Sequence, residues 1–233
     1  LYVIIVFMII FKGVSKYYNG NVAVENLNFK IEPGEFVSLI GKSGSGKTTI
    51  LKLIIKEIEP SEGEIYYKGR NYNEFTEKDI VNLRREIATI FQDLKLLTNM
   101  TAYENVAFVM EAKGEKDSVI KREIPKIFEL VGLEEKINFF PNQLSGGEQQ
   151  RVAIARALAQ KPQVILADEL TSNLDPITAQ EILLILKKIN ELGTTIILAT
   201  HNYEQLKKFN IRSLLLENGR IVKDAYGKPL IIS

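Results

Sequence analysis

Short runs of apolar and β-branched residues alternate along this chain with longer segments whose apolar positions recur at helical spacing. The run at residues 36–40 is followed by a helical pattern at residues 48–58, and the run at residues 164–168 by one at residues 177–192. A further apolar run occupies residues 194–200. Strands and helices that alternate in this way form βαβ units, in which helices cover both faces of a mainly parallel sheet. The pattern therefore predicts an α/β fold.

The middle of the chain, residues 94–161, departs from this alternation. It has no convincing strand pattern, and its helical segments are interrupted at Gly114, Gly132 and Pro141, residue types that end helices. We predict a helical subdomain inserted into an α/β core that consists of residues 8–93 and 162–226.

The chain opens with the apolar run "LYVIIVFMIIF", which stops at Lys12. A membrane-spanning helix needs about 20 apolar residues, and the run lacks the basic start and the small-residue cleavage site of a signal peptide. We therefore interpret it as a strand. Because Met8 directly precedes a plausible strand, we interpret residues 1–7 as an upstream extension of a single domain at residues 8–226. The polar residues 66–79 predict a loop.

Composition narrows the classes of function. The chain of 233 residues is 45% hydrophobic and 25% charged, as in soluble globular domains. Its net charge of +1 argues against nucleic acid as the main partner. Without cysteines it has neither a disulfide framework nor thiolate-bound metals. An anionic ligand must therefore be bound by local features.

The stretch "GKSGSGKTT" lies between a predicted strand and a predicted helix and fits the pattern G-x-x-x-x-G-K-[ST] of phosphate-binding loops. Glycines here let backbone N–H groups surround phosphate oxygens. Lys47 supplies a positive charge to the β and γ phosphates, and Thr48 offers its hydroxyl to Mg²⁺. The predicted nucleotide-binding residues of the loop are Gly41, Ser43, Gly44, Ser45, Gly46, Lys47, Thr48 and Thr49.

Two carboxylates, Asp168 and Glu169, end the apolar run "VILADE". The carboxyl ends of parallel strands form the edge at which α/β sheets bind ligands. An acidic pair after a strand is also common in solvated loops, but a phosphate loop on the same sheet favours a hydrolysis site. We expect Asp168 to hold Mg²⁺ through water, and Glu169 to orient or deprotonate the attacking water.

A third motif, "LSGGEQQ", precedes a helical segment. Ser145 and Glu148 have the spacing of a capping box at a helix N-terminus. Capping does not explain Gly146 and Gly147, because each glycine in a helix costs about 1 kcal/mol relative to alanine. We therefore expect another group to approach this backbone closely, and the bare N–H groups of a helix N-terminus suit an anion.

The chain has a single histidine, His201, where the apolar run at residues 194–200 stops. A lone histidine is more often a surface or satisfied core residue than a functional one. The end of a predicted parallel strand, however, places His201 at the same sheet edge as Asp168. This position favours a functional role.

Taken in order, these motifs resemble those of the ATP-binding cassette family over residues 8–226. The resemblance implies an ATPase with a P-loop NTPase core, a mainly parallel sheet, an N-terminal antiparallel β part and an inserted α-helical subdomain. It implies ATP and Mg²⁺ as cofactors, and a homodimer in which the signature of one subunit covers the phosphate loop of the other. The implied signature residues are Ser145, Gly146, Gly147 and Glu148, and the implied catalytic residues are Lys47, Gln92, Glu169 and His201.

The resemblance also assigns individual residues. It implies that Tyr18 stacks on adenine, with Tyr17 as the alternative, and that Asp175 in "SNLD" belongs to the D-loop. It implies that Gln92 is the Q-loop residue near Mg²⁺ and the γ-phosphate, which His201 contacts. The implied metal-site residues are Thr48, Gln92 and Asp168.

One position departs from the family pattern. Leu170 follows the carboxylate pair where the family usually has proline. Loss of the fixed backbone angle of proline predicts a looser turn after Glu169, while no catalytic group is lost. We expect activity to be retained.

Within the family, the segment after Gln92 most resembles the cell-division branch, FtsE, through Asp93, Lys95 and the run from Tyr103 to Phe108. The resemblance implies a peripheral protein on the cytoplasmic side of the cell membrane. It would drive an FtsX-like integral membrane partner and control cell-wall hydrolysis at division. The ATPase subunit of a lipoprotein-release or macrolide-efflux exporter remains the alternative.

Two other classes fit less well. A DNA-repair or chromosome-type cassette would carry a long heptad insertion, which this sequence lacks. A module without turnover would be expected to lack Glu169 or His201. For the membrane-linked class, the resemblance implies a partner groove after Gln92, and we expect exposed apolar residues there, interleaved with polar ones. The candidates are Leu94, Leu96, Leu97 and Met100, with Lys95 and Asn99 between them.

Overall fold

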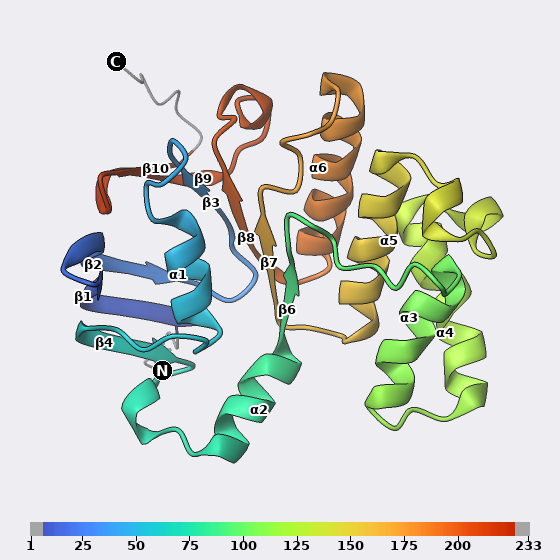
Figure 1. The fold of residues 1–233 in the computed structure, drawn as a ribbon, viewed down its shortest axis with the longest axis horizontal. Helices are drawn as coiled ribbons and strands as arrows, with labels where there is room; N and C mark the ends of the chain where they lie inside the picture. Colours follow the sequence, from blue (N-terminus) through green and yellow to red (C-terminus); the bar gives the residue numbers. More distant parts are fainter. Residues whose placement is uncertain (1–6, 227–233) are drawn as a thin grey trace, which may run out of the picture.

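Residues 7–226 are described by the computed structural model and form two sheets flanked by helices (Figure 1). The strands are β1 (Ile9–Tyr18), β2 (Asn21–Ile31), β3 (Phe36–Ile40), β4 (Glu62–Tyr67), β5 (Arg70–Asn71), β6 (Ile87–Ile90), β7 (Val164–Asp168), β8 (Thr195–Thr200), β9 (Arg212–Glu217) and β10 (Arg220–Tyr226). The α-helices are α1 (Lys47–Ile54), α2 (Glu77–Glu86), α3 (Ala102–Ala112), α4 (Asp117–Val131), α5 (Gly146–Ala159) and α6 (Pro176–Glu191). Short 3-10 turns are η1 (Tyr72–Glu74), η2 (Glu134–Lys136), η3 (Pro141–Gln143) and η4 (Glu204–Leu206).

The larger sheet has the strand order β10-β9-β3-β8-β7-β6. All neighbours pair in parallel except β10, which is antiparallel to β9. Because helices cover both faces, alternate residues of one strand enter different cores. Leu166 of β7 packs on the side of α1, whereas Ile165 and Ala167 pack on the side of α5 and α6 (Figure 1). The predicted strand runs therefore are apolar throughout, as parallel strands buried on both faces require.

The smaller sheet is antiparallel, with the order β2-β1-β4-β5, and α1 lies between it and the larger sheet (Figure 1). This confirms the predicted N-terminal antiparallel part.

β1 begins at Ile9, and residues 1–6 of the opening apolar run lie outside the described residues. The loop predicted at residues 66–79 is wrong, because this segment holds the end of β4, β5, η1 and the start of α2. A capping box between Thr76 and Asp79 begins that helix.

The helical insert is confirmed as α3, α4 and α5. The chain turns after α3 at Gly114 (φ +78°) and after α4 at Gly132 (φ +67°), where a left-handed backbone suits glycine. α5 packs on α3 and α4 and also on α6 and β6, so one buried cluster crosses from the insert to the sheet. The boundaries at residues 94 and 161 stay a prediction. Within residues 7–226, no helix is both long and apolar enough to span a membrane.

Candidate active site

Three loops meet at the carboxyl edge of the larger sheet. The phosphate loop follows β3, whose last residue, Ile40, pairs with Thr200 of β8. Asp168 ends β7 and pairs with Ala199, two residues before His201. Together the phosphate loop, His201 and residues 215–218 line a cavity of about 510 Å³. The parallel register thus brings the phosphate loop, the carboxylate pair and His201 to one edge, whereas the signature motif is not part of this group.

The glycines at the ends of the phosphate loop are required by close packing. A Cβ on Gly41 would lie 2.5 Å from the carbonyl oxygen of Leu216, and one on Gly46 would lie 2.6 Å from Cγ1 of Val24. Gly46 and Gly44 also have positive φ angles, of +106° and +78°. Only glycine adopts such a backbone without strain. The loop is therefore held tightly between β9 of the larger sheet and β2 of the smaller one, with Ser43 exposed, Thr49 half-buried and Ser45 buried at its base.

The ammonium group of Lys47 is buried inside this loop. Its Nζ donates hydrogen bonds to the carbonyl oxygens of Gly41 (2.7 Å) and Lys42 (3.1 Å). It also lies 3.3 Å from Oε1 of Glu169. A buried charge needs such partners. Lys47 is therefore paired with Glu169 across the site.

Asp168 and Thr48 form a polar pair beside Lys47. The hydroxyl of Thr48 donates to Oδ2 of Asp168 over 2.9 Å. The other oxygen, Oδ1, is buried and has no hydrogen-bond partner among the described residues. Burial raises the pKa of Asp168 above its ordinary value, and the hydrogen bond from Thr48 opposes this. A buried carboxylate oxygen beside a hydroxyl is a suitable environment for a hard cation such as Mg²⁺.

A metal ion at this site would need oxygen ligands besides those of Thr48 and Asp168. No group of three or more His, Cys, Asp or Glu residues in the described part of the chain is arranged to hold a metal. Mg²⁺ commonly takes one or two protein ligands and completes its shell with phosphate and water. The donor set of Thr48 and Asp168 therefore fits Mg²⁺ that arrives with a nucleotide.

Glu169 connects the site to the histidine. Its Oε2 lies 2.8 Å from Nδ1 of His201, whose side chain is 53% exposed. Glu169 has a left-handed backbone (φ +50°), a strained conformation for a residue other than glycine. Its N–H donates to the carbonyl oxygen of Ala199 over 2.9 Å, which holds the strained residue against β8. Strain of this kind clusters at functional sites.

The turn after Glu169 is held by hydrogen bonds, and the looser turn expected from Leu170 in place of proline stays a prediction. The N–H and the hydroxyl of Ser172 both donate to the carbonyl oxygen of Glu169, over 3.2 Å and 2.8 Å. The side chain of Leu170 is 1% exposed and belongs to the hydrophobic core under α5 and α6. The buried leucine side chain therefore anchors this turn to the core.

The signature motif begins α5 through a capping box, as predicted. Ser145 Oγ accepts from the N–H of Glu148 (3.3 Å), and the N–H of Ser145 donates to Oε2 of Glu148 (2.8 Å). The expectation about the glycines needs correction. A Cβ on Gly147 would lie 2.4 Å from Cγ2 of Thr178, so the group that approaches it belongs to the same chain. Gly146 is open, with its nearest such contact at 4.0 Å.

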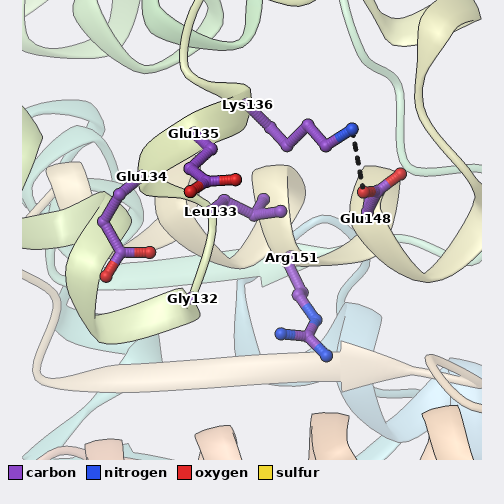
Figure 2. Close-up of a pocket in the computed structure, with 7 residues that line it drawn as sticks. All are labelled: Gly132, Leu133, Glu134, Glu135, Lys136, Glu148 and Arg151. Carbon is purple, nitrogen blue, oxygen red and sulfur yellow. Dashed lines mark ion pairs between the residues drawn. The ribbon is translucent and has the colours of Figure 1, made fainter.

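A second cavity, of about 500 Å³, lies beside the first turn of α5 (Figure 2). Figure 2 shows Lys136 pointing toward Glu148, with 3.8 Å between Nζ and Oε1. The N–H of Ser145 lowers the pKa of Glu148. Arg151, which also lines the cavity, is paired with Glu181. Around this cavity Lys136 and Glu148 thus hold the signature turn, while Arg151 joins α5 to α6.

The other predicted site residues lie on separate elements. The signature on α5 and the phosphate loop at α1 belong to helices on opposite faces of the larger sheet (Figure 1). Tyr18 is 42% exposed at the end of β1, with Nζ of Lys16 5.4 Å from its ring centre. Gln92 is exposed two residues beyond β6. Asp175 caps α6 by accepting from the N–H groups of Ile177 and Thr178.

The expectation that the loop after Gln92 exposes its leucines is wrong. Leu94, Leu96, Leu97 and Met100 are half-buried, and Leu94 and Leu96 pack on the core. The more exposed apolar rings in this region are Phe91 (40%) and Phe108 (49%). Sequence reasoning also missed Arg156, whose guanidinium donates to the carbonyl oxygens of Leu94 (2.5 Å) and Lys95 (2.6 Å). Both of these residues have left-handed backbones. Because Arg156 binds their carbonyl oxygens, it holds the loop through the main chain of the loop.

Helices cover both faces of the mainly parallel sheet, a glycine-rich phosphate loop follows one of its strands, and an acidic pair follows another. These features define a P-loop nucleoside triphosphatase. Residues 24–172 match the family model described as ABC transporter. The chain belongs to this family and is an ABC-type ATPase domain with ATP as its substrate.

Relatives with curated names fall into more than one branch of this family. The chain is 46% identical to the cell division ATP-binding protein FtsE of Bacillus subtilis over 93% of its own length and 96% of that protein. It is 43% identical to the methionine import ATP-binding protein MetN of Legionella pneumophila over 91% of its length and 62% of that protein. A dimeric structure of the ATP-binding cassette MJ0796, bound to ADP and Pi, superposes with a TM-score of 0.83 at 36% identity, covering 96% of this chain and all of that one.

Proposed function

We propose that this chain is the ATPase subunit of an FtsE-like membrane complex, in which ATP closes a homodimer and hydrolysis reopens it. Identity of 43–46% to FtsE proteins over more than nine-tenths of the chain carries the assignment. The features Asp93, Lys95 and the run from Tyr103 to Phe108 support the same branch. In this role the protein lies on the cytoplasmic side of the membrane, bound to an FtsX-like integral protein, and its output is control of cell-wall hydrolysis at division.

The dimer is proposed because each chain holds two half-sites. Ser145 and the N–H groups of the first turn of α5 lie on the opposite face of the sheet from the helix that follows Lys47. In a head-to-tail dimer, the signature of one subunit would cover the phosphates bound by the other. The similar cassette MJ0796 is described as dimeric with ADP and Pi bound. Gly146, open to solvent, leaves room for a partner's nucleotide.

Hydrolysis is proposed to use residues already in contact. Phosphate oxygens would replace Glu169 as the partner of Lys47, which frees the carboxylate to accept a proton from water. His201, released from Glu169, would contact the γ-phosphate. Thr48, Asp168 and Gln92 would hold Mg²⁺, which neutralises phosphate charge when bound. Tyr18 is the proposed adenine platform, and Asp175 places the D-loop by capping α6.

A Glu169→Gln variant tests the half-site proposal. It should bind ATP but lose at least about 100-fold in turnover, since a general base contributes that much. With ATP the variant should elute as a dimer in size-exclusion chromatography with light scattering, and as a monomer without it. A monomer that holds ATP at saturation would refute the half-site proposal.

The branch assignment is tested by co-purification from native membranes with the trapped Glu169→Gln variant. An FtsX-like protein as the main membrane partner supports the proposal. A permease of a lipoprotein-release, macrolide-efflux or amino-acid import system as the main partner would refute it. The import system is included because MetN, a methionine import protein, is among the relatives. Phe91→Asp and Phe108→Asp should weaken recovery of the partner, whereas Val81→Asp, a 50% exposed residue of α2, serves as a matched control.

A further inference from the structure

The turn that carries Glu169 and the loop that carries His201 are joined by a second contact. The hydroxyl of Thr171 donates to Oε1 of Gln205 over 2.8 Å, across 34 positions of sequence. Thr171 is 2% exposed, so its hydroxyl is a buried polar group that needs this partner. The bridge therefore ties the loop after β7 to the 3-10 turn η4 that follows β8.

Gln205 is itself anchored to the residue after the histidine. Its N–H donates to Oδ1 of Asn202 (3.4 Å), and the N–H of Asn202 donates to Oγ1 of Thr200 (3.1 Å). Residues 200–205 therefore form a hydrogen-bonded loop around His201. A shift of Thr171 relative to Gln205 would be transmitted to both sides of the histidine.

The bridge lies away from the reacting groups. Gln205 is half-buried and lines a cavity of about 280 Å³ with residues that are not in the phosphate loop: Pro176, Gln180, Asn202, Glu204 and Lys208. By contrast, the direct contact between Glu169 and His201 uses the atoms that our proposed function assigns to water and to phosphate. In that proposed function nucleotide binding weakens the direct contact, whereas the bond between Thr171 and Gln205 uses no atom that is assigned to nucleotide or water.

We propose that Thr171 and Gln205 are positioning residues, which keep Glu169 and His201 at a fixed separation while the direct contact between them is exchanged for substrate. This inference rests on the proposed roles of Glu169 and His201. Glu169 has particular need of such support, because its left-handed backbone (φ +50°) would otherwise relax. Neither Thr171 nor Gln205 touches substrate.

The test uses variants that remove the bond with little change of shape. Thr171→Val and Gln205→Leu should each lower kcat about 3- to 10-fold, the range expected for one net hydrogen bond, with KM for ATP changed less than twofold. Thr171→Ser retains the hydroxyl and should keep most of the wild-type kcat. Since His201 is the single histidine, its imidazole signals in an NMR spectrum report its surroundings directly, and they should shift in the first two variants but not in Thr171→Ser.

A matched control removes a similar buried bond elsewhere. Ser213→Ala breaks the 2.8 Å contact between the hydroxyls of Ser38 and Ser213 in β3 and β9. It should lower Tm to a similar extent yet leave the His201 signals and kcat unchanged. Wild-type kcat and unmoved His201 signals in Thr171→Val and Gln205→Leu would overturn the inference, as would the same losses in Ser213→Ala.

Failure of the underlying roles gives a different result. If Glu169→Gln and His201→Ala hydrolyse ATP at the wild-type rate, the proposed function of these residues is refuted, and the bridge has no catalytic pair to position. If both variants are inactive while Thr171→Val and Gln205→Leu are normal, only the bridge inference is refuted. Should Thr171→Val fail to fold, Gln205→Leu alone decides, because its side chain borders open space.

Discussion

Replacement of Gly147 by alanine would place a methyl carbon 2.4 Å from Cγ2 of Thr178. Overpacking of this kind costs about 1–3 kcal/mol, while alanine gains about 1 kcal/mol of helix propensity over glycine. The net effect should be a loss of about 1 kcal/mol. In a domain of this size that corresponds to a Tm lower by about 2–4 °C. Gly146→Ala meets nothing closer than 4.0 Å and should be neutral or stabilising.

Scanning calorimetry without nucleotide measures this difference in the isolated chain. Thr178→Ser in the Gly147→Ala background removes the clashing methyl group and keeps the hydroxyl that donates to Oδ2 of Asp175 over 2.5 Å. The double variant should recover most of the lost Tm. Equal Tm values for Gly146→Ala and Gly147→Ala, with no rescue by Thr178→Ser, would refute the packing account of Gly147. Gly146→Ala should instead impair ATP-driven dimerisation, because the backbone at Gly146, unlike that at Gly147, is open to a partner.

Three further predictions concern charge and loop geometry. Asp168→Asn should raise Tm without ligand, because burial raises the pKa of Asp168 and so penalises its charged form, and calorimetric titration should show loss of Mg²⁺-dependent ATP binding. The pKa of Glu148 is lowered in the folded state, so its contribution to stability is present above pH 4.5, the ordinary pKa, and is lost as the pH falls through the folded-state pKa. Between pH 7 and pH 3 the Tm of Glu148→Gln should therefore fall less than that of the wild type. Arg156→Met should free the backbone at Lys95, so that trypsin cuts there faster while Arg156→Lys gives an intermediate rate; equal rates would refute a clamp by Arg156.

The local motifs of the site could be predicted because each is fixed by neighbours in the sequence. Hydrophobic runs identified β3, β7 and β8 but not β6 or β9, and the parallel neighbours β7 and β8 necessarily bring Asp168 and His201 to one edge. The capping box of Ser145 and Glu148 could likewise be predicted from spacing alone. In contrast, α1 ends at Ile54 rather than near residue 58, since Lys56 turns left-handed and Glu57 bonds back to Lys52. The helical spacing of apolar residues continues to residue 58, although the backbone leaves the helix after Ile54.

Contacts between residues far apart in the sequence could not be predicted from the pattern of apolar and polar positions. The approach of Thr178 to Gly147 joins two helices, so the glycine carried no local sign of its neighbour. Leu170 is apolar in a loop, and only the packing of α5 and α6 shows that it fills the core. The bond between Thr171 and Gln205 spans two loops whose distance depends on the order of β7 and β8. Such contacts follow from the tertiary fold and not from spacing.

The clamp by Arg156 has a consequence for how this loop can diversify. The guanidinium binds main-chain oxygens, which every residue possesses, so this hydrogen bond does not depend on which side chain stands at position 95. Lys95 is exposed and left-handed, a conformation that asparagine and glycine also accept readily. The side chain at this position can therefore change among residues that accept this backbone while the clamp by Arg156 is kept. Loop libraries varied at positions 95, 98 and 99 over a constant Arg156 would be a rational starting point for redirecting the protein to other partners.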